Sequence, residues 1–357
     1  MIVHLIDGTY ELFRHFYGLR RFNKGADRPY GAVVGVLQTL LAMIESGDTY
    51  LGVATDHVIE SFRNRLWADY KTGAGIEPAL RAQFHPLEEA LAAMGVVVWP
   101  MIELEADDAL ASAAHLAAKD RKVEKVAIWT PDKDLAQCVR GTRVVQCDAR
   151  RKTIRDAAGI REKFGVDPPL ISDLLALVGD AADGYPGIPG IGAKTAAELL
   201  NRHGPIEDFP ADVLGRRRDL ALLFKDLATL RTDAPLFKKV ETLRWRGATP
   251  AFAAWAKRME APQLLERCEL RMGSRARRRR AYDGPPHTSL TPAQDHDEEE
   301  HSAREQGEPE HDRPGGARGR RGELGAVERG GGGGRHETGG HEPKTEKDEN
   351  RGHKREE

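Results

Sequence analysis

The chain has 357 residues, with 54 Lys and Arg against 56 Asp and Glu, and it contains only three cysteines. No stretch approaches the 18 uninterrupted apolar residues typical of a membrane span, and the N-terminal sequence lacks the basic flank of a signal peptide. We therefore expect a cytoplasmic protein with no membrane partner. The scattered cysteines exclude a disulfide framework and a thiolate metal site, so we expect them to be free and buried.

The charges and apolar residues are unevenly distributed along the chain. Residues 284–357 carry 12 Lys and Arg and 18 Asp and Glu but no aromatic residue, so they cannot bury a core. Residues 1–283 keep 42 basic and 38 acidic residues, a net charge of +4. The sequence predicts one folded body and a disordered low-complexity tail, which either tethers a protein partner or keeps the chain soluble.

The folded body begins with alternating strand and helix patterns. Short apolar runs of the kind found in buried parallel strands occupy residues 2–6, 50–55, 96–99 and 123–129. Helical patterns between them cover residues 35–44, 79–94 and 106–119. This alternation predicts an α/β fold with a mainly parallel sheet.

Beyond about residue 165 the pattern becomes helical, and no further strand is persuasive. The expected helices cover residues 170–178, 193–202, 218–230 and 252–259. Residues 211–283 carry a net charge of +9, and they end in a basic cluster at 275–280. That cluster is either a nucleic-acid contact or a solvated helix end.

Acidic residues follow three of the predicted strands. Asp7 and Asp56 end two apolar runs, and Asp132 comes shortly after a third. Because right-handed crossovers bring the carboxyl ends of parallel strands to the same edge, we expect these side chains to lie close together. Open α/β sheets bind their ligands at that edge.

Nine acidic residues are candidate metal ligands. Each alone is explained as a solvated residue or a helix cap, and Asp107 and Asp108 suit the first turn of a helix without any metal. Together they would repel one another strongly, because two carboxylates 4 Å apart repel by about 4 kcal/mol at an effective dielectric near 20. The candidates are Asp7, Asp56, Glu105, Asp107, Asp108, Asp132, Asp134, Asp180 and Asp183.

Divalent cations would relieve this repulsion. Ligands that are all oxygen favour Mg²⁺ or Mn²⁺ over zinc, which prefers His or Cys. The spacings Asp132-x-Asp134 and Asp180-x-x-Asp183 let one ion, or an adjacent pair of ions, reach both acids of each motif. Two ions about 3.5–4 Å apart activate water and stabilise the departing oxygen of a phosphodiester, so the pattern predicts a metal-dependent nuclease.

The sequence PGIPGIGAKTA at residues 186–196 is typical of a helix-hairpin-helix turn. Its glycines, Gly190 and Gly192 among them, allow backbone N–H groups to approach a phosphate at a helix N-terminus, and Lys194 adds positive charge there. The alternative is a plain Pro/Gly turn before a helix. The continuation through Lys194 and Thr195 into a helical pattern favours the DNA-binding interpretation.

With these motifs in place, residues 1 to about 240 resemble the bacterial and phage 5′-nuclease family, the exonucleases related to flap endonucleases and to the N-terminal domain of DNA polymerase I. The agreement lies in the order and spacing of several short motifs. They are Asp7-Gly8 with Arg14, Asp56, Phe62-Arg63, Tyr70-Lys71, Leu80-Arg81-Ala82-Gln83, Glu105-Ala106-Asp107-Asp108, Asp132-Lys133-Asp134 with Ala136-Gln137, Leu175-Ala176-Leu177-x-Gly179-Asp180, and the hairpin turn.

The resemblance implies a PIN-like catalytic domain at 1–165 with a helical arch at about 60–90, and a helix-hairpin-helix DNA-binding domain with basic C-terminal helices at 166–283. It implies two or more Mg²⁺ or Mn²⁺ ions and hydrolysis of DNA near a 5′ end or a 5′ flap junction. Nothing downstream resembles a polymerase, so we expect a standalone, monomeric, nucleoid-associated nuclease.

The resemblance also assigns roles to basic and aromatic residues. Lys71 and Arg14 match residues that contact the scissile phosphate, and Arg63 and Tyr70 match DNA-contacting positions of the arch. Considered without the family, Arg63 and Lys71 fit an exposed helix face equally well, and Tyr70 fits a core position as well as base stacking. Ala74 stands where the family usually has an arginine, Pro131 where it has a small residue, and Gly184 where it has an asparagine.

Two other functions share part of this pattern. A PIN-domain ribonuclease would have the sheet and some of the acids, although such proteins are usually shorter and lack the hairpin. A non-catalytic, structure-specific DNA-binding protein would use its acids to bind metal for stability alone.

Overall fold

The computed structural model describes residues 1–23 and 29–282, with side chains described except at 20–23 and 274–282. The predicted tail at 284–357 and the side chains of the basic cluster at 275–280 therefore lie outside the described residues. Within the described ranges, no helix is both long enough and apolar enough to span a membrane.

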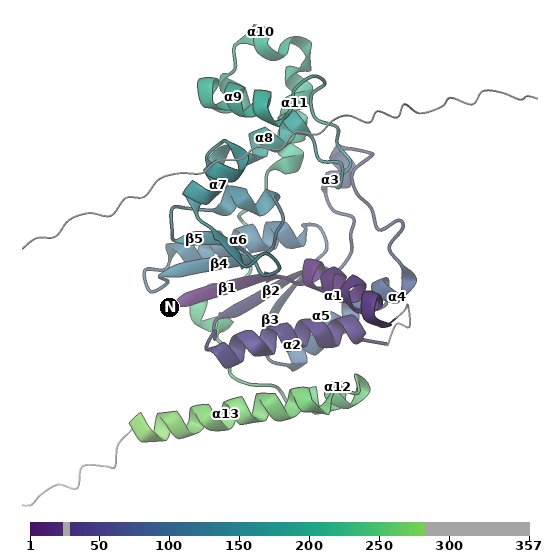
Figure 1. Ribbon diagram of the computed structural model, residues 1–357, viewed down its shortest axis with the longest axis vertical. Coiled ribbons are helices and arrows are strands. Elements are labelled where there is room, and N and C mark those ends of the chain that lie inside the picture. Colours follow the sequence, from purple (N-terminus) through teal and green to yellow (C-terminus); the bar gives the residue numbers. More distant parts are fainter. Residues whose placement is uncertain (24–28, 283–357) are drawn as a thin grey trace, which may run out of the picture. The chain divides into compact units, whose positions relative to one another are not determined.

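A six-stranded sheet lies at the centre of the N-terminal half (Figure 1). The strand order is β3-β2-β1-β4-β5-β6, and only β6 is antiparallel to its neighbour. The four strands predicted from apolar runs are present within two residues of the predicted bounds, which confirms the parallel α/β fold. The strands are β1 (Ile2–Asp7), β2 (Leu51–Asp56), β3 (Val97–Met101), β4 (Lys125–Trp129), β5 (Val144–Asp148) and β6 (Thr153–Arg155).

The register of the sheet aligns the carboxyl ends of the central strands. Asp7 lies opposite Ala54, and Ile6 lies opposite Trp129. The order of the strands reverses between β1 and β4, which makes the carboxyl edge of these two strands the switch point where open α/β sheets bind ligands. The acids that follow β1, β2 and β4 therefore start from neighbouring positions.

Strands β5 and β6 were not predicted from the sequence. The β5 segment contains Gln146 and ends in Asp148, so it lacks the unbroken apolar run of the other strands, although all five of its residues are buried. The short β6 strand has an exposed centre, with Ile154 68% exposed. The exposure of β6 follows from its position, because it is a short edge strand at the end of the sheet.

Helices cover both faces of the sheet. On one face, apolar residues of α1 (Gly8–Asn23), α2 (Gly31–Ser46) and α5 (Phe84–Ala93) share a core with β1 and β2. On the other face, α6 (Ala106–Lys119) packs against β1 to β4 and occupies the predicted residues. The sheet is thus enclosed over its central strands, as parallel sheets usually are.

The predicted arch segment, 60–90, contains short helices rather than one long one. They are α3 (Arg63–Leu66), α4 (Pro78–Arg81) and the first part of α5. The helix predicted for 79–94 is interrupted near Gln83. The side-chain oxygen of Gln83 accepts hydrogen bonds from the backbone N–H groups of Ala32 and Val33, at 3.0 and 3.3 Å, and so caps α2.

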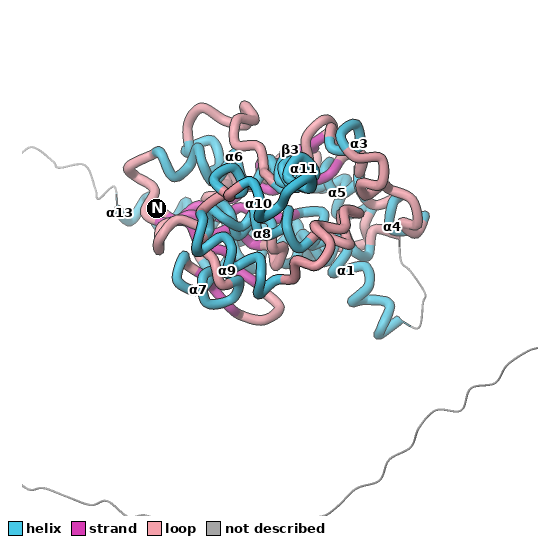
Figure 2. The backbone as a smooth tube through the Cα atoms, turned by 90° about the horizontal axis from the view of Figure 1, so that it is seen from above, coloured by secondary structure: helices cyan, strands magenta, loops and turns pink. Residues whose placement is uncertain are grey.

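The chain after β6 is helical, as predicted, and Figure 2 shows α8 to α11 lying over the sheet when seen from above. Apolar residues of α8, α9 and α11 form their own core, which also receives Tyr70. The helices and 3₁₀ turns are η1 (Asp134–Cys138), α7 (Ala157–Phe164), η2 (Pro168–Leu170), α8 (Ile171–Val178), α9 (Ala193–His203), η3 (Ile206–Asp208), α10 (Ala211–Leu214), η4 (Gly215–Arg217), α11 (Arg218–Ala228), η5 (Val240–Leu243), α12 (Phe252–Arg258) and α13 (Pro262–Tyr282).

The last two helices do not join the core formed by α8, α9 and α11. Phe252 on α12 and Leu264 and Cys268 on α13 belong to the core built around α2. The indole N–H of Trp245 donates to the carbonyl oxygen of Met94 at 2.9 Å and ties the preceding segment to the end of α5. The helical region after residue 165 therefore contributes to more than one core, since Val240 and Leu243 of η5 pack into the core around α6.

The loop that carries Asp180 and Asp183 packs tightly against the arch segment. Gly184 has φ +82, and a Cβ atom there would lie 2.0 Å from the carbonyl oxygen of Asp69. The indole N–H of Trp67 donates to the carbonyl oxygen of Gly184 at 3.0 Å. Glycine at this position thus permits this close backbone contact.

We expect Gly184→Ala to lower the free energy of unfolding by about 1–3 kcal/mol, because the new Cβ clashes with backbone and the left-handed conformation is strained. Gly18→Ala is the control, since Gly18 lies inside α1 and a Cβ atom added there would meet no atom within 4 Å. We expect this control to stabilise the protein by about 0.5–1 kcal/mol. Urea unfolding with EDTA present measures both. Equal stability of Gly184→Ala and the unmodified chain would contradict the contact.

Candidate active site

The first acids lie at the ends of β1 and β2. The Asp7 carboxylate accepts hydrogen bonds from the backbone N–H of Tyr10 at 2.8 Å and from the Thr130 hydroxyl at 3.0 Å. Asp56 accepts from the backbone N–H of Ala106, at the start of α6, at 2.8 Å. These bonds hold both carboxylates at the carboxyl edge, where the sequence predicted them.

Asp132 and Asp134 follow β4 in one tight turn. The backbone N–H of Asp134 donates to the Asp132 carboxylate at 2.9 Å, and Asp132 is exposed. Asp134 is 6% exposed, and its Oδ1 atom has no hydrogen-bond partner among the described residues. Burying a carboxylate oxygen without a hydrogen-bond partner costs free energy, so this oxygen marks a position where a cation would be stabilising.

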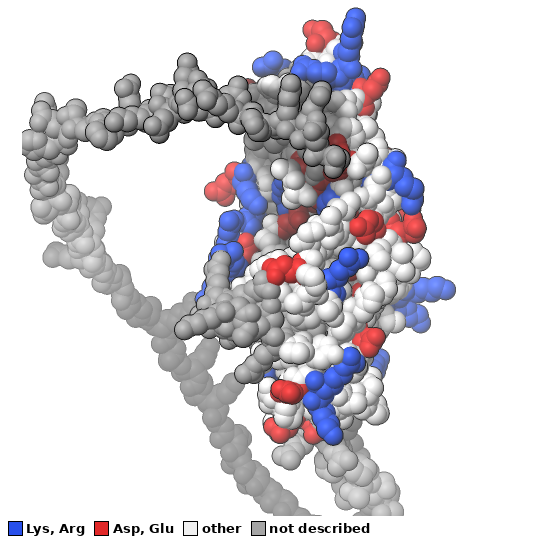
Figure 3. Space-filling view, turned by 90° about the vertical axis from the view of Figure 1, so that its right-hand side faces the viewer, with Lys and Arg blue, Asp and Glu red and all other residues white. Residues whose placement is uncertain are grey.

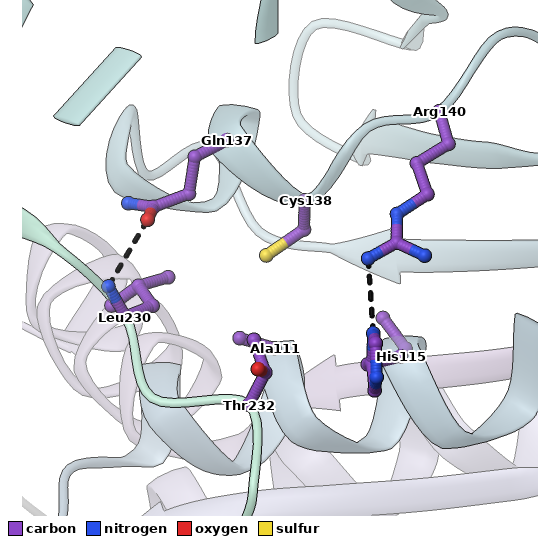
Figure 4. Close-up of a pocket in the computed structure, with 8 residues that line it drawn as sticks. Ala111, His115, Gln137, Cys138, Arg140, Leu230 and Thr232 are labelled. Atoms are coloured by element: carbon purple, nitrogen blue, oxygen red, sulfur yellow. Dashed lines mark hydrogen bonds between the residues drawn. The ribbon is translucent and has the colours of Figure 1, made fainter. Parts of the chain in front are cut away.

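Gln137 fixes this turn to the helical region. Its side-chain amide donates to the carbonyl oxygens of Asp134 and Ala228, at 2.9 and 3.0 Å, and accepts from the backbone N–H of Leu230 at 3.0 Å. Figure 4 shows the bond to Leu230 beside a small cavity of about 70 Å³, into which the Cys138 thiol points. These hydrogen bonds fix the turn that carries Asp134 to the end of α11 and the segment that follows it.

Asp134 meets two further acids from the helical region. Ligand atoms of Asp134, Asp180 and Asp183 all lie within 4.8 Å of one another, and all three residues are buried. Asp180 is held by a backbone bridge to Tyr185, with N–O distances of 2.8 and 3.1 Å. We refer to these three residues as the acidic triad.

Electrostatics connect the triad to the acids of the sheet edge. Burial, together with the charges of Asp56 and Asp132, raises the pKa of Asp7 to about 7. Burial and the charge of Asp132 also raise the pKa values of Asp107 and Asp134 well above the ordinary range for aspartate. Because the same neighbours recur, these acids form one electrostatically coupled group.

Two lysines lie within this group. The Lys71 ammonium is 2.8 Å from Glu105 and 3.0 Å from Asp183. The Lys133 ammonium is 2.7 Å from the Oδ2 atom of Asp180. Lys71 therefore lies among the acids.

Asp108 does not suit the predicted role of metal ligand. It is fully buried, and its two oxygens accept four hydrogen bonds of 2.7 to 3.0 Å. Two come from the Arg63 guanidinium, and the others from the backbone N–H groups of Glu105 and Arg231. All four acceptor sites of the carboxylate are occupied, so we correct its assignment to a structural one.

Arg63 and Tyr70 do not suit their predicted DNA contacts, because they are only 1% and 3% exposed. Arg63 pairs with Asp108 and Glu105 and also donates to the carbonyl oxygen of Leu227 at 2.8 Å. Tyr70 packs in the core of the helical region. These side chains join the arch segment, the start of α6 and the end of α11 from inside the molecule.

Glu105 is also occupied by protein groups. It accepts from the Ser61 hydroxyl at 2.6 Å and pairs with both Arg63 and Lys71. Burial by itself would raise the pKa of Glu105, but the charges of Lys71 and Arg63 outweigh this effect and lower the pKa. Its carboxylate is thus charged and becomes available to a metal only if Lys71 moves away.

Arg14 lies on α1 and is paired with Glu11 on the same helix, with its Nε atom 3.0 Å from the carboxylate. The adjacent His15 ring is 2.9 Å from the Thr39 hydroxyl. Burial and then the charge of Arg14 lower the pKa of His15 to about 4, so the ring is neutral at physiological pH. Arg14 is half-buried rather than free on the surface.

The predicted hairpin turn connects α8 to α9, and it is largely exposed from residue 189 to residue 195, whereas Ile188 is buried. Gly190 has φ +83, and Gly192, Lys194 and Thr195 are exposed at the start of α9. The N-cap residue is Gly192, which has no side chain to cap the first N–H groups of the helix. The guanidinium of Arg217 donates to the carbonyl oxygen of Pro189 at 2.7 Å and holds the turn in place.

The surface around the site has mixed charge. Figure 3 shows the side on which α1, α3 and α4 lie in Figure 1, and Lys and Arg are interspersed there with Asp and Glu. In the described part of that face, no broad basic patch is visible.

Models of a known family match most of this chain. Residues 2–165 match the 5′-3′ exonuclease N-terminal resolvase-like domain, and residues 166–251 match the 5′-3′ exonuclease C-terminal SAM fold. The chain belongs to the 5′-3′ exonuclease family. The family therefore accounts for both the sheet and the helical region that supplies Asp180 and Asp183.

Individual relatives agree with this assignment. The chain is 33% identical over 259 residues to the 5′-3′ exonuclease of Aquifex aeolicus, covering 68% of this chain and 86% of that protein. It is 36% identical over 261 residues to DNA polymerase I of Pseudomonas aeruginosa, covering 67% of this chain but only 28% of the polymerase. The chain thus spans less than a third of that relative.

Solved structures show the same fold at lower identity. The zinc-bound T5 5′-exonuclease matches with a TM-score of 0.51 and 19% identity, covering 77% of this chain and 99% of that one. The catalytic core of Rad2 in complex with DNA substrate matches with a TM-score of 0.50 and 14% identity, covering 75% and 92%. In this family fold, the acidic triad lies where the sheet edge meets the helical region.

Several residues that shape the site were not predicted from the sequence. Thr130 and Ser61 orient carboxylates, but a single hydroxyl residue beside an apolar run gives no distinctive signal. Lys133 was visible only as the middle residue of Asp132-Lys133-Asp134. Its pairing with Asp180 joins residues that are 47 positions apart and cannot be read from local spacing.

We expect Arg63→Met to lower the free energy of unfolding by about 3–5 kcal/mol, because it leaves Asp108 buried without its partner. Arg65→Met is the matched control, since Arg65 pairs with Glu103 at 3.1 Å between side chains that are 68% and 73% exposed. It should change stability by less than about 1 kcal/mol. Chemical denaturation measures both, and a stable Arg63→Met variant with weakened DNA binding would restore the original DNA-contact assignment.

The raised pKa values of Asp7, Asp107 and Asp134 predict a pH-dependent stability without metal. Such a carboxyl binds more protons when folded, so the free energy of unfolding falls as pH rises from about 4 to about 7. We expect a loss of at least about 2 kcal/mol between pH 5 and 8 in EDTA, and a smaller loss with saturating Mn²⁺. Stability that rises with pH in EDTA would contradict the coupling of the acids.

Proposed function

We propose that this protein is a divalent-metal-dependent 5′ nuclease that hydrolyses phosphodiester bonds of DNA near a 5′ end or flap junction. The acidic triad carries this proposal, because it contains a buried carboxylate oxygen without a hydrogen-bond partner among the described residues. Membership in the 5′-3′ exonuclease family supports the same reaction class. The proposal covers the nuclease reaction alone and no polymerase activity.

The donor set fits Mg²⁺ or Mn²⁺, and we propose two or more ions. The oxygens of the triad would hold one, and the acids of the sheet edge would hold another. When bound, such ions activate a water molecule and stabilise the departing oxygen of the phosphodiester. The residues proposed to ligate them are Asp7, Asp56, Asp107, Asp132, Asp134, Asp180 and Asp183.

Lys71 is the proposed phosphate-orienting residue. Its ammonium lies between Glu105 and Asp183, and its side chain is 31% exposed, so it borders both the acids and solvent. Its backbone N–H donates to the carbonyl oxygen of Asp183 at 3.1 Å, which fixes the base of the side chain. A positive charge in this position orients a phosphate and offsets developing negative charge. Ala74 leaves this lysine without the arginine that the family usually supplies nearby.

The hairpin turn is the proposed DNA-binding element. The uncapped N–H groups that open α9, together with Lys194, suit a backbone phosphate and do not read base sequence. The turn and the triad are joined by the short segment from Asp183 to Pro186. The proposed DNA-binding turn and the acids of the triad are therefore neighbours in the sequence.

We expect Asp134→Asn to reduce cleavage of a 5′-flap DNA at least about 100-fold while changing DNA affinity less than about threefold, because it removes a metal ligand and not a DNA contact. Asp173→Asn is the control: Asp173 is also buried and pairs with a lysine, Lys225, at 2.8 Å, but it lies outside the triad. It should lower stability and retain turnover.

Parallel single-stranded RNA substrates test the ribonuclease alternative, and flap binding without cleavage by the unmodified protein in Mg²⁺ would leave a DNA-binding role only.

We expect Lys194→Ala to weaken flap-DNA binding at low salt and to reduce the slope of log affinity against log salt by about one. The lysine is exposed at the helix start, where it can neutralise one phosphate. Lys257→Ala, on α12, is a charge-matched control that should leave the slope unchanged. Fluorescence anisotropy at several salt concentrations measures the slope, and an unchanged slope for Lys194→Ala would remove the turn from the interface.

A further inference from the structure

Lys133 lies in the middle of the acidic site, between two acids in sequence, and pairs with a third in space. Its ammonium is 2.7 Å from the Oδ2 atom of Asp180, while the Oδ1 atom accepts the backbone N–H of Ala182 at 3.0 Å. Both oxygens of Asp180 are thus occupied by protein donors. The Asp180 side chain is 7% exposed, so its charge depends on these donors for stabilisation.

The three acids of the triad are neutralised unequally. Asp183 pairs with Lys71, Asp180 pairs with Lys133, and the Oδ1 atom of Asp134 has no partner among the described residues. Counted as fully ionised, the three acids carry a formal charge of −3 and the two lysines one of +2, and Lys71 shares its charge with Glu105. The lysines therefore provide within the protein part of the positive charge that a divalent ion would supply.

An ion bound to Asp180 Oδ2 and the Lys133 ammonium beside the same oxygen would repel each other. Magnesium binds carboxylate oxygens at about 2.0–2.1 Å, and a second cation within hydrogen-bond distance of the same oxygen would repel it. Lys133 is able to leave, because its side chain is 37% exposed and unbranched. Lys71 is held more firmly, since it pairs with two acids and its backbone N–H is bonded to the carbonyl oxygen of Asp183.

We propose that Lys133 is an internal counter-cation that competes with the divalent ion for Asp180 and thereby sets the ion affinity of the acidic triad. This inference rests on the proposed metal-dependent function. Lys133 holds the acids together when no ion is bound, and it moves toward solvent when an ion enters. It is a positioning residue, and its effect is on the stability of the site with and without the ion.

Equilibrium binding of Mn²⁺ to the full chain without DNA tests this inference. We expect Lys133→Met to bind Mn²⁺ about two- to fivefold more tightly than the unmodified chain, because the competing charge is gone. The same variant should melt at a lower temperature in EDTA and recover in Mn²⁺. Lys133→Arg keeps the charge and should retain an affinity close to that of the unmodified chain.

Lys122→Met controls for the change in total charge. Lys122 also pairs with a carboxylate, that of Glu241, at 3.0 Å, and it precedes β4 at the amino edge of the sheet, away from the triad. It should leave Mn²⁺ affinity unchanged. An unchanged or weaker affinity for Lys133→Met would overturn the inference and show that Lys133 only holds Asp180 in place. If the unmodified chain itself bound no Mn²⁺, the proposed metal-dependent function would fail instead.

Discussion

Repulsion between carboxylates is the interaction on which the rest of this structure depends. Burial raises the pKa values of Asp7, Asp107 and Asp134, and the charges of neighbouring carboxylates, that of Asp132 in each case, act in the same direction. A fold gains nothing in stability from such an arrangement, since burying like charges is costly. The surrounding structure has to supply hydrogen bonds, lysines and, by our proposal, divalent cations that offset the repulsion. The arrangement is therefore typical of a functional site, whose cost in stability is offset by interactions elsewhere in the fold.

Arg63 shows how the surrounding structure does this. It connects the arch segment to Asp108 and Glu105 at the start of α6 and to the carbonyl oxygen of Leu227 at the end of α11. The α6 start also carries Asp107, and the helical region supplies Asp180 and Asp183. A single buried guanidinium thus links the two regions whose acids form the candidate site.

The sequence predicted the features that have strong local signals. The apolar strands, α6 and the acids of the carboxyl edge were all found, because a parallel sheet requires buried strands and brings their ends together. β5 and β6 were missed because one contains polar residues and the other is a short edge strand. The roles of Arg63, Tyr70 and Asp108 could not be read from motifs, since burial depends on contacts between residues more than 40 positions apart. Local spacing identified which residues matter and did not distinguish ligands from the groups that support them.

Crystallography of the full chain soaked in Mn²⁺ tests the central claim most directly, because anomalous scattering locates the ions without reference to activity. The account predicts a strong peak in contact with Asp134, Asp180 and Asp183, and a second among the acids at the ends of β1 and β4. Peaks confined to the protein surface, with Lys71 and Lys133 still paired to their acids at saturating Mn²⁺, would contradict it.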